Sequence, residues 1–396
     1  CEACHGAGSE YQLEAIMLDP RAAAEAGLLK PDAKTCKTCH KDPHFDFEAM
    51  YERIAHPVET KQRSAKVIYK TPFNLCLNRA GDRLLVACEE SNSLIIADTI
   101  ARKVVAEIPV GMQPHDVCLS PDETLAYVTN RMDDTLSVID LSTNKIIENV
   151  PTGDEPHGVL TDVSGETIYV VNTGTGDISV IDAKTLKPIK RLVASRGAWS
   201  LARSPDGRYI HVTNNLSYFI EFRTPAESEI TVIDTEKQIV VDRPVFVEAN
   251  LVQGIDFDPK GRFSLVTLLR TKNLVPMTRI TQGWTITNGL GLVWKDGQLD
   301  QTLLDEVNSY FADPTDVVIT PDGRYAYVTG GGVDAVAVVD LNKLVDLLES
   351  SSEDVRKNVI PNHLGYPVEY VVKRIPVGAS PRGIAVSQNG KYVYVA

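Results

Sequence analysis

The chain has 396 residues, with 40 Lys and Arg against 53 Asp and Glu, a formal net charge of −13, and 43% hydrophobic residues. This length and composition predict a globular protein with a sizeable core, built as one large repeat domain or as two or three ordinary domains. The acidic balance argues against nucleic acid or an anionic membrane as partner, because both require a basic surface. No apolar run approaches the ~18–20 residues of a membrane-spanning helix, so we expect no membrane span.

Neither end of the chain has the sequence expected of a natural terminus. It begins at Cys1 without an initiator Met, and it ends at Ala396 within an alternating strand pattern. A strand that ends in mid-hairpin leaves backbone groups unpaired. We therefore expect the chain to be part of a longer polypeptide.

Four of the seven cysteines form two copies of the pattern C-x-x-C-H near the start of the chain. The first copy is Cys1, Cys4 and His5, and the second is Cys36, Cys39 and His40. Two thiols one helical turn apart suit thioether bonds to one porphyrin, and the following His then ligates the iron. The repeated motif predicts at least two haem c groups, held by these four thiols, with His5 and His40 as proximal ligands.

Two other chemistries use paired cysteines. A C-x-x-C…C-x-x-C zinc site needs no His after each pair, yet both pairs here have one. A thioredoxin-like dithiol requires a surrounding βαβ pattern, which neither motif has. The remaining cysteines, Cys76, Cys88 and Cys118, fall in strand-like runs and are expected to be buried free thiols.

Residues 1–60 are predicted to form a small helical module. Asp19-Pro20 before an Ala-rich run that stops at Gly27 predicts one helix, and Asp46 to His56, ended by Pro57, predicts another. Each iron has a second axial position that His usually fills in low-spin electron carriers. The candidates are His56 and His44. His56 is favoured because a longer stretch of chain separates it from the second haem motif.

This module resembles the last two haem motifs of multihaem cytochromes of the hydroxylamine-pathway tetrahaem type. The resemblance lies in residues 4–11, Gly27-Leu28, Pro31-Asp32, residues 34–36 and residues 54–57, with Ala7 where the family usually has Pro. The earlier haem motifs of that family are absent here. The resemblance covers about 15% of the chain and implies bis-His haems that carry electrons.

From residue 72 to residue 396, after a linker at 61–71, the sequence becomes repetitive. A turn of the Ser-Pro-Asp-Gly kind recurs, and its last residue advances by 42, 42, 42, 54, 62 and 67 positions from Gly81 to Gly390. Four short strands follow within about 42 residues, which is the pattern of one β-propeller blade. Seven turns predict seven blades, the last one incomplete at Ala396.

These repeats resemble the YVTN repeat family, whose name is spelled by residues 127–130. The resemblance covers more than 80% of the chain. It implies a mainly β fold, a seven-bladed propeller, to which the small α-helical haem module is joined. The missing strands of the last blade are expected after Ala396 or near residues 66–69.

Later blades carry insertions, where binding often resides. Loops are expected at residues 214–229 and 268–291, and a helix at 341–357. Trp284 and Trp294 are interpreted as packing anchors, and His211 and His363 as structural residues.

Two histidines stand at the start of consecutive innermost strands, His115 in Gln-Pro-His-Asp and His157 in Glu-Pro-His-Gly. A ring of histidines at the axis would suit copper or haem, as in propeller denitrification reductases. The equivalent later positions, however, are Trp199, Gln253, Thr315 and Arg382. We therefore interpret the two histidines as packing and hydrogen-bonding residues.

Three functions remain open. The first is electron transfer by a periplasmic or extracellular multihaem cytochrome whose propeller docks redox partners, further haem domains or other copies. The second is a haem-dependent oxidoreductase with a catalytic centre on the propeller face or beyond residue 396. The third is an assembly protein in which the propeller is chiefly scaffold. Bis-His ligation favours the first, because it leaves no open position on the iron.

Overall fold

A computed structural model describes residue 25 and residues 32–39, 46–48, 69–218, 224–271, 286–364 and 368–396. The chain divides into two compact units, Cys1–Val67 and Ile68–Ala396. No helix in the described ranges is long and apolar enough to cross a membrane.

In the first unit, helix α4 spans Ala33–Cys39. Asp32 begins this helix, because its Oδ1 accepts hydrogen bonds from the backbone N–H and the hydroxyl of Thr35, both at 2.7 Å. The helix predicted from Asp46 to His56 is described only at residues 46–48, where Phe47 and Glu48 are helical. Its remainder lies outside the described residues.

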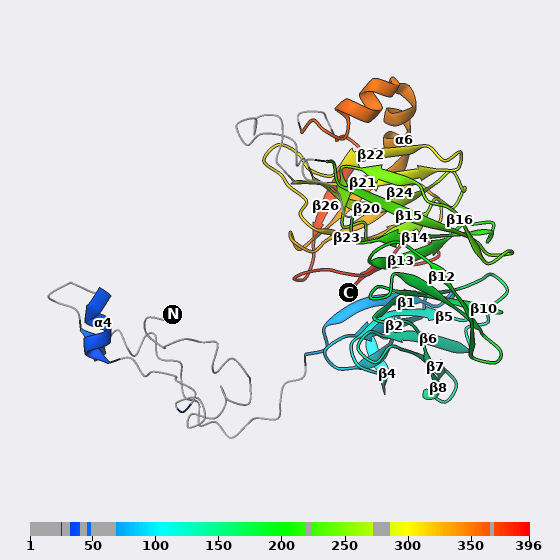
Figure 1. The fold of residues 1–396 in the computed structure, drawn as a ribbon. Helices are drawn as coiled ribbons and strands as arrows, with labels where there is room; N and C mark the ends of the chain where they lie inside the picture. The colour runs from blue at the N-terminus through cyan, green and yellow to red at the C-terminus, as the bar shows by residue number, and fades with distance from the viewer. Residues whose placement is uncertain are drawn as a thin grey trace. The chain divides into compact units, whose positions relative to one another are not determined.

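The second unit is propeller-like and mainly β (Figure 1). Its sheets follow one another in chain order, and neighbouring strands within each sheet are antiparallel. The first three sheets have four strands each: β1 Pro72–Leu77, β2 Arg83–Cys88, β3 Ser93–Asp98 and β4 Lys103–Pro109; β5 Pro114–Leu119, β6 Leu125–Asn130, β7 Thr135–Asp140 and β8 Lys145–Pro151; β9 Pro156–Thr161, β10 Thr167–Asn172, β11 Asp177–Asp182 and β12 Lys187–Val193.

The next three sheets have four or five strands, and the last described sheet has two. They are β13 Ala198–Arg203, β14 Tyr209–Asn214, β15 Glu227–Asp234, β16 Ile239–Asp242 and β17 Val245–Val247; β18 Ala249–Asn250, β19 Ile255–Phe257, β20 Phe263–Thr271, β21 Ile286–Trp294 and β22 Leu299–Leu303; β23 Pro314–Ile319, β24 Tyr325–Gly330, β25 Ala335–Asp340 and β26 Val371–Pro376; and β27 Ile384–Val386 with β28 Val393–Val395.

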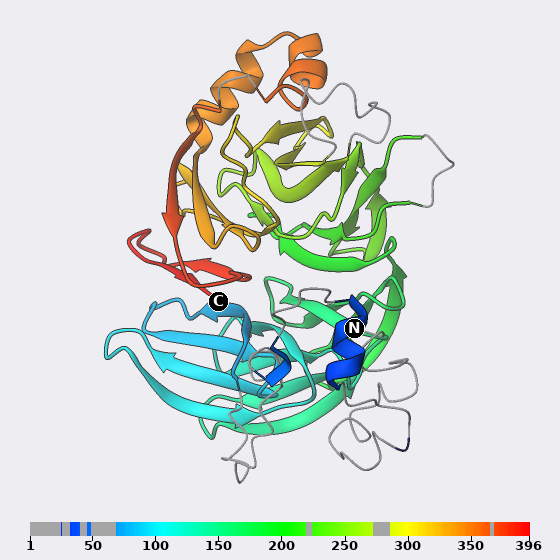
Figure 2. The same cartoon turned by 90° about the vertical axis from the view of Figure 1, so that its left-hand side faces the viewer.

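Six complete blades are thus present in the part of the chain that the structure describes, and the count of seven blades stays a prediction. The two-stranded sheet lies beside β1 (Figure 2), where the N–H of Gly383 donates to the carbonyl of Phe73 at 2.9 Å. This bond joins the two ends of the sheet series.

The recurrent turn forms where the sequence predicts it. The last residue of each of the seven turns has a positive φ, between 59° and 75°, namely Gly81, Glu123, Gly165, Gly207, Gly261, Gly323 and Gly390. Glycine suits six of these positions because it lacks the Cβ that crowds the left-handed region. The turn therefore sets the spacing between the first and second strand of each sheet.

The insertions differ in part from the predicted loops. Residues 268–271 and 286–291, expected to be loop, instead belong to the antiparallel pair β20 and β21, in which residues 268–271 pair one to one with residues 286–289. The helix predicted over residues 341–357 ends earlier. Helix α6 spans Leu341–Ser350, and a separate π-helical turn, η3, spans Val355–Val359.

Candidate functional site at the propeller axis

The innermost strands of the first four sheets each present a ring at their second residue. These rings are Phe73 of β1, His115 of β5, His157 of β9 and Trp199 of β13. The next three equivalent positions are Gln253, Thr315 and Arg382. These three residues line one axial cavity of about 30 Å³ together with Phe73, His157 and Trp199. The correspondence predicted between these positions is confirmed.

The four rings form a continuous stack. Phe73 lies parallel to His115 with ring centroids 4.1 Å apart, and His115 meets His157 edge-on at 4.6 Å. His157 in turn lies on Trp199 at 3.7 Å. Because each side chain comes from a different sheet, the stack ties four consecutive blades together at the axis.

Burial keeps both histidines neutral. It lowers the pKa of His115 and takes that of His157 well below its usual value. Glu89, between β2 and β3, lies 3.4 Å from Nε2 of His115, and this contact lowers the carboxyl pKa of Glu89. Since an ionised carboxylate only accepts, Nε2 of His115 carries the proton and Nδ1 is left as a bare acceptor.

Two imidazole nitrogens near the axis lack a hydrogen-bond partner, which is unusual for buried polar atoms. Nδ1 of His115 and Nε2 of His157 are buried without a hydrogen-bond partner. Within the described ranges, no group of three or more His, Cys, Asp and Glu is arranged to hold a metal ion. The ring contacts of both histidines support the packing part of their interpretation as packing and hydrogen-bonding residues.

Sequence reasoning missed two members of the stack and its carboxylate. Phe73 was not recognised, and Trp199 was named only as an equivalent position. The shared Pro before Phe73, His115 and His157 was the available signal. Nothing in the sequence marks Glu89, because its contact crosses from one blade to the next.

Most of the predicted haem residues lie outside the described residues: Cys1, Cys4, His5, His40, His44 and His56. Cys36 is buried on α4, and Cys39 is the last residue of the same helix. Their spacing of three residues places them one helical turn apart, as attachment to one porphyrin requires. None of Cys36, Cys76, Cys88 and Cys118 forms a disulfide.

Cys76 and Cys118 occupy the fifth residue of β1 and of β5, which confirms their predicted equivalence. Burial raises the pKa of both thiols, and it raises that of Cys88 to about 11. These thiols are protonated at neutral pH, which makes them unreactive.

A family model described as "Cytochrome D1 heme domain" matches residues 79–213, which carry β2 to β13 and three of the four rings of the axial stack. The match covers about a third of the chain. It supports a haem-related β-propeller family.

One curated protein and one solved structure are also similar to this chain. The beta subunit of hydrazine synthase from Kuenenia stuttgartiensis is 27% identical over 195 residues, which are 49% of this chain and 49% of that protein. The aligned part thus spans about half the length of that relative. A solved Kuenenia stuttgartiensis hydrazine synthase chain is 26% identical, with a TM-score of 0.79, over 85% of this chain and 95% of that one.

A haem does not fit among the axial rings. The cavity of about 30 Å³ is far below the ~300–1,000 Å³ of ordinary ligand pockets, since the rings of Phe73, His115, His157 and Trp199 fill the space. The two histidines contact each other, which leaves no room for a macrocycle between them.

Proposed function

We propose that this chain transfers electrons in an extracytoplasmic multihaem protein, with the propeller as docking and assembly scaffold. The observation that carries the proposal is the pair of C-x-x-C-H motifs in one chain with a propeller that resembles a haem domain and a hydrazine synthase subunit. The closed axial stack also supports it, because the stack leaves the N-terminal motifs as the place for haem.

In this proposal residues 1–60 hold two haem c groups, residues 61–71 link them to residues 72–396, and the propeller has seven blades. Cys1, Cys4, Cys36 and Cys39 form the thioethers, His5 and His40 bind iron, and His56 or His44 occupies a distal position. Haem c supplies a one-electron redox centre when bound. Since haem c is attached outside the cytoplasm, the site of action is periplasmic or extracellular.

Haem counting tests the proposal. We expect the protein, produced with a c-type maturation system, to carry at least two covalent haems by mass, with low-spin reduced-minus-oxidised spectra. Cys36→Ala with Cys39→Ala lowers the count by one, whereas Cys76→Ser, a change to a cysteine in β1, leaves it unchanged. A protein without covalent haem, or with zinc at these thiols, contradicts the proposal.

A second function, a haem-dependent oxidoreductase, is favoured by the similarity to hydrazine synthase, which implies a multi-subunit complex. It differs from pure electron transfer in requiring an iron with an open position. A high-spin haem that binds an added ligand such as carbon monoxide supports this function, and uniformly low-spin haem supports the first.

A further inference from the structure

The axial cavity of about 30 Å³ is lined by two polar side chains that are more than nine-tenths buried. They are His157 of β9, which is 4% exposed, and Gln253, between β18 and β19, which is 8% exposed. The half-buried Ser200 of β13 lines the same cavity. Because buried polar atoms nearly always have a hydrogen-bond partner, the partners of these side chains decide what the cavity holds.

His157 presents a bare acceptor. Its Nε2 is buried without a partner among the described residues. Burial takes the pKa of the imidazole well below its usual value, and a hydrogen bond at the backbone of Trp199 acts in the opposite direction. A hydrogen bond that favours the charged ring is donated by the ring, and Nδ1 is the donor because Nε2 has no partner. Nε2 of the neutral ring therefore carries a lone pair that lacks a donor.

Gln253 and Ser200 also have unused polar atoms, although their backbone groups are paired. The N–H of Gln253 donates to the carbonyl of Thr267 at 3.3 Å, and its carbonyl accepts from Thr213 at 2.7 Å. The N–H of Ser200 donates to the hydroxyl of Thr213 at 3.0 Å. Neither the side-chain amide of Gln253 nor the hydroxyl of Ser200 forms a hydrogen bond in the described part of the chain. The cavity thus gathers an imidazole acceptor, an amide and a hydroxyl.

The cavity has the size of one or two water molecules. A buried water requires about 10–15 Å³ of such space and roughly two to four polar partners, and both conditions are met here. Two positions of the wall cannot carry a larger side chain. A Cβ added to Gly254 would lie 2.4 Å from Cα of Asp316, and one added to Gly383 would lie 2.3 Å from Oδ1 of Asn74.

The charged groups of the lining favour a neutral occupant. They are one carboxyl, that of Asp316, and one guanidinium, that of Arg382. Asp316 accepts from the N–H of Val317 at 2.8 Å and from that of Ile384 at 3.1 Å, and Arg382 lies 3.8 Å from the carboxylate of Asp313. Because the two charges are opposite in sign and engaged within the chain, they favour neither an anion nor a cation.

We propose that the axial cavity binds one or two ordered water molecules, of which one donates a hydrogen bond to Nε2 of His157 and also bonds to the side-chain amide of Gln253. Ser200 supplies a third contact. The water thereby links the third, fourth and fifth blades at the axis. The site involves no haem, so it stands or falls separately from the electron-transfer function.

A high-resolution crystal structure of the protein tests the occupant directly. We expect a density peak at about 2.7–3.2 Å from both Nε2 of His157 and the side-chain amide of Gln253. A cavity without a density peak overturns the proposal. A metal ion, recognised by a distance of about 2.0–2.1 Å from Nε2, overturns it as well.

A pair of substitutions tests the same water in solution. His157→Phe keeps a ring in the stack, as Phe73 does at the equivalent position of β1, and Gln253→Met keeps the length of the side chain. Each removes one partner of the water, so we expect each to lower the melting temperature in calorimetric scans. The double variant is expected to lose clearly less than the sum of the two single losses, because both side chains act through one water.

In a dry cavity the same substitutions would remove unsatisfied polar groups, so a higher melting temperature in both single variants overturns the proposal. Strictly additive losses overturn it too, since they would show that the two side chains share no bound molecule. Gln238→Met is the matched control, because the amide of Gln238 donates to Thr167 at 3.4 Å at the start of the outermost strand β16. Its effect is expected to add to that of His157→Phe.

Discussion

Two polar residues at the end of the second strand form equivalent hydrogen bonds to buried backbone groups in several blades. The Thr of the second strand donates to a carbonyl of the next innermost strand, as Thr129 does to His157 at 2.6 Å and Thr213 to Gln253 at 2.7 Å. The Asn after it accepts from the loop that enters its own blade, as Asn130 does from the N–H of Gly111 at 3.1 Å. These side chains form the hydrogen bonds that water would otherwise form with backbone groups buried between the packed blades.

Asn130 offers the sharpest test of this role. It is fully buried, and its amide also donates to Ser137 at 2.8 Å and to Thr135 at 3.0 Å. Asn130→Ala removes these hydrogen bonds and leaves the N–H of Gly111 without its acceptor, so we expect it to lower the free energy of unfolding by about 2–4 kcal/mol. Denaturant unfolding measures the loss. Lys187→Ala, at an exposed strand end, is expected to cost less than about 0.5 kcal/mol, and an equal effect of both changes would contradict this role for Asn130.

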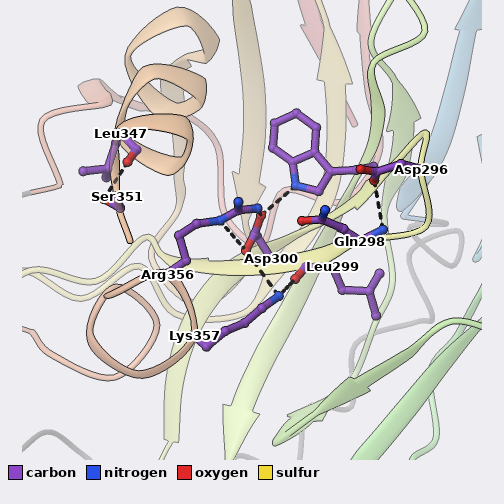
Figure 3. A network of polar contacts seen from close by, with 9 residues as sticks. Asp296, Gln298, Leu299, Asp300, Leu347, Ser351, Arg356 and Lys357 are labelled. Atoms are coloured by element: carbon purple, nitrogen blue, oxygen red, sulfur yellow. Dashed lines mark hydrogen bonds and ion pairs between the residues drawn. The ribbon is translucent and has the colours of Figure 1, made fainter. Parts of the chain in front are cut away.

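At the scale of elements, the insertion after β25 is fastened by one buried carboxylate (Figure 3). Asp300 of β22 is fully buried and accepts from Nε1 of Trp294 at 2.7 Å and from Nε of Arg356 at 3.2 Å. Lys357 adds an ion pair at 3.5 Å and donates to the carbonyl of Leu299. Three donors satisfy the carboxylate, so the turn η3 is held against the fifth blade.

Helix α6 is held in a different way, through its apolar face. Asp340 accepts hydrogen bonds from the N–H groups of Asn342 and Lys343, which begins the helix, and Leu341, Leu344, Val345 and Leu348 are buried. The apolar face ends at Ser350. Beyond it, the contacts of Arg356 and Lys357 with Asp300 hold the chain against the fifth blade. The predicted helix is therefore divided in two: α6 ends at Ser350, and the separate turn η3 carries the contacts with Asp300.

Removing the carboxylate is expected to release η3. Asp300→Ala leaves Arg356 and Lys357 without their buried partner, and trypsin should then cleave after these residues at least several-fold faster, because cleavage requires local opening. Asp346→Ala, on the exposed side of α6, is the matched control with no expected effect. Unchanged cleavage in Asp300→Ala would show that apolar packing alone holds the insertion.

At the scale of the whole molecule, three half-buried aspartates link neighbouring blades near the axis. Each is the second or third residue of an innermost strand and accepts from the backbone of the next blade: Asp116 from Val159 at 2.9 Å, Asp256 from Ile319 at 2.7 Å and Asp316 from Ile384 at 3.1 Å. Burial raises their pKa values to about 7, 6 and 8, against the opposing effect of these N–H donors.

A pH dependence follows from these shifts. Because the folded-state pKa is raised, the stabilisation from each protonated group is complete below about pH 4 and is lost as the pH rises through about 6 to 8. Asp316→Asn keeps an acceptor oxygen without the charge. We expect its melting temperature to fall less than that of wild type between pH 4 and pH 8, in calorimetric scans at constant ionic strength. Parallel curves for the two proteins would contradict this linkage.

The local repeat was largely predictable. The turns, the strands between them and the equivalence of Cys76 with Cys118 follow from residues close together in sequence, because a blade forms from consecutive hairpins. The long hairpin of β20 and β21 was not foreseen, since an insertion of that length carries no repeat to compare it with.

The sequence by itself determined the repeating turn-and-strand unit, the position of His115 and His157 at the axis, and the two C-x-x-C-H motifs, because each depends on neighbours within about one blade. Only the tertiary structure decided that these histidines join Phe73 and Trp199 in a closed stack, and that His211 contacts Ser264 and Phe257 of the next blade. The reason is physical: which side chains meet at the axis or between blades depends on how separate sheets pack, and residues 42 or more positions apart carry no local signal of that contact.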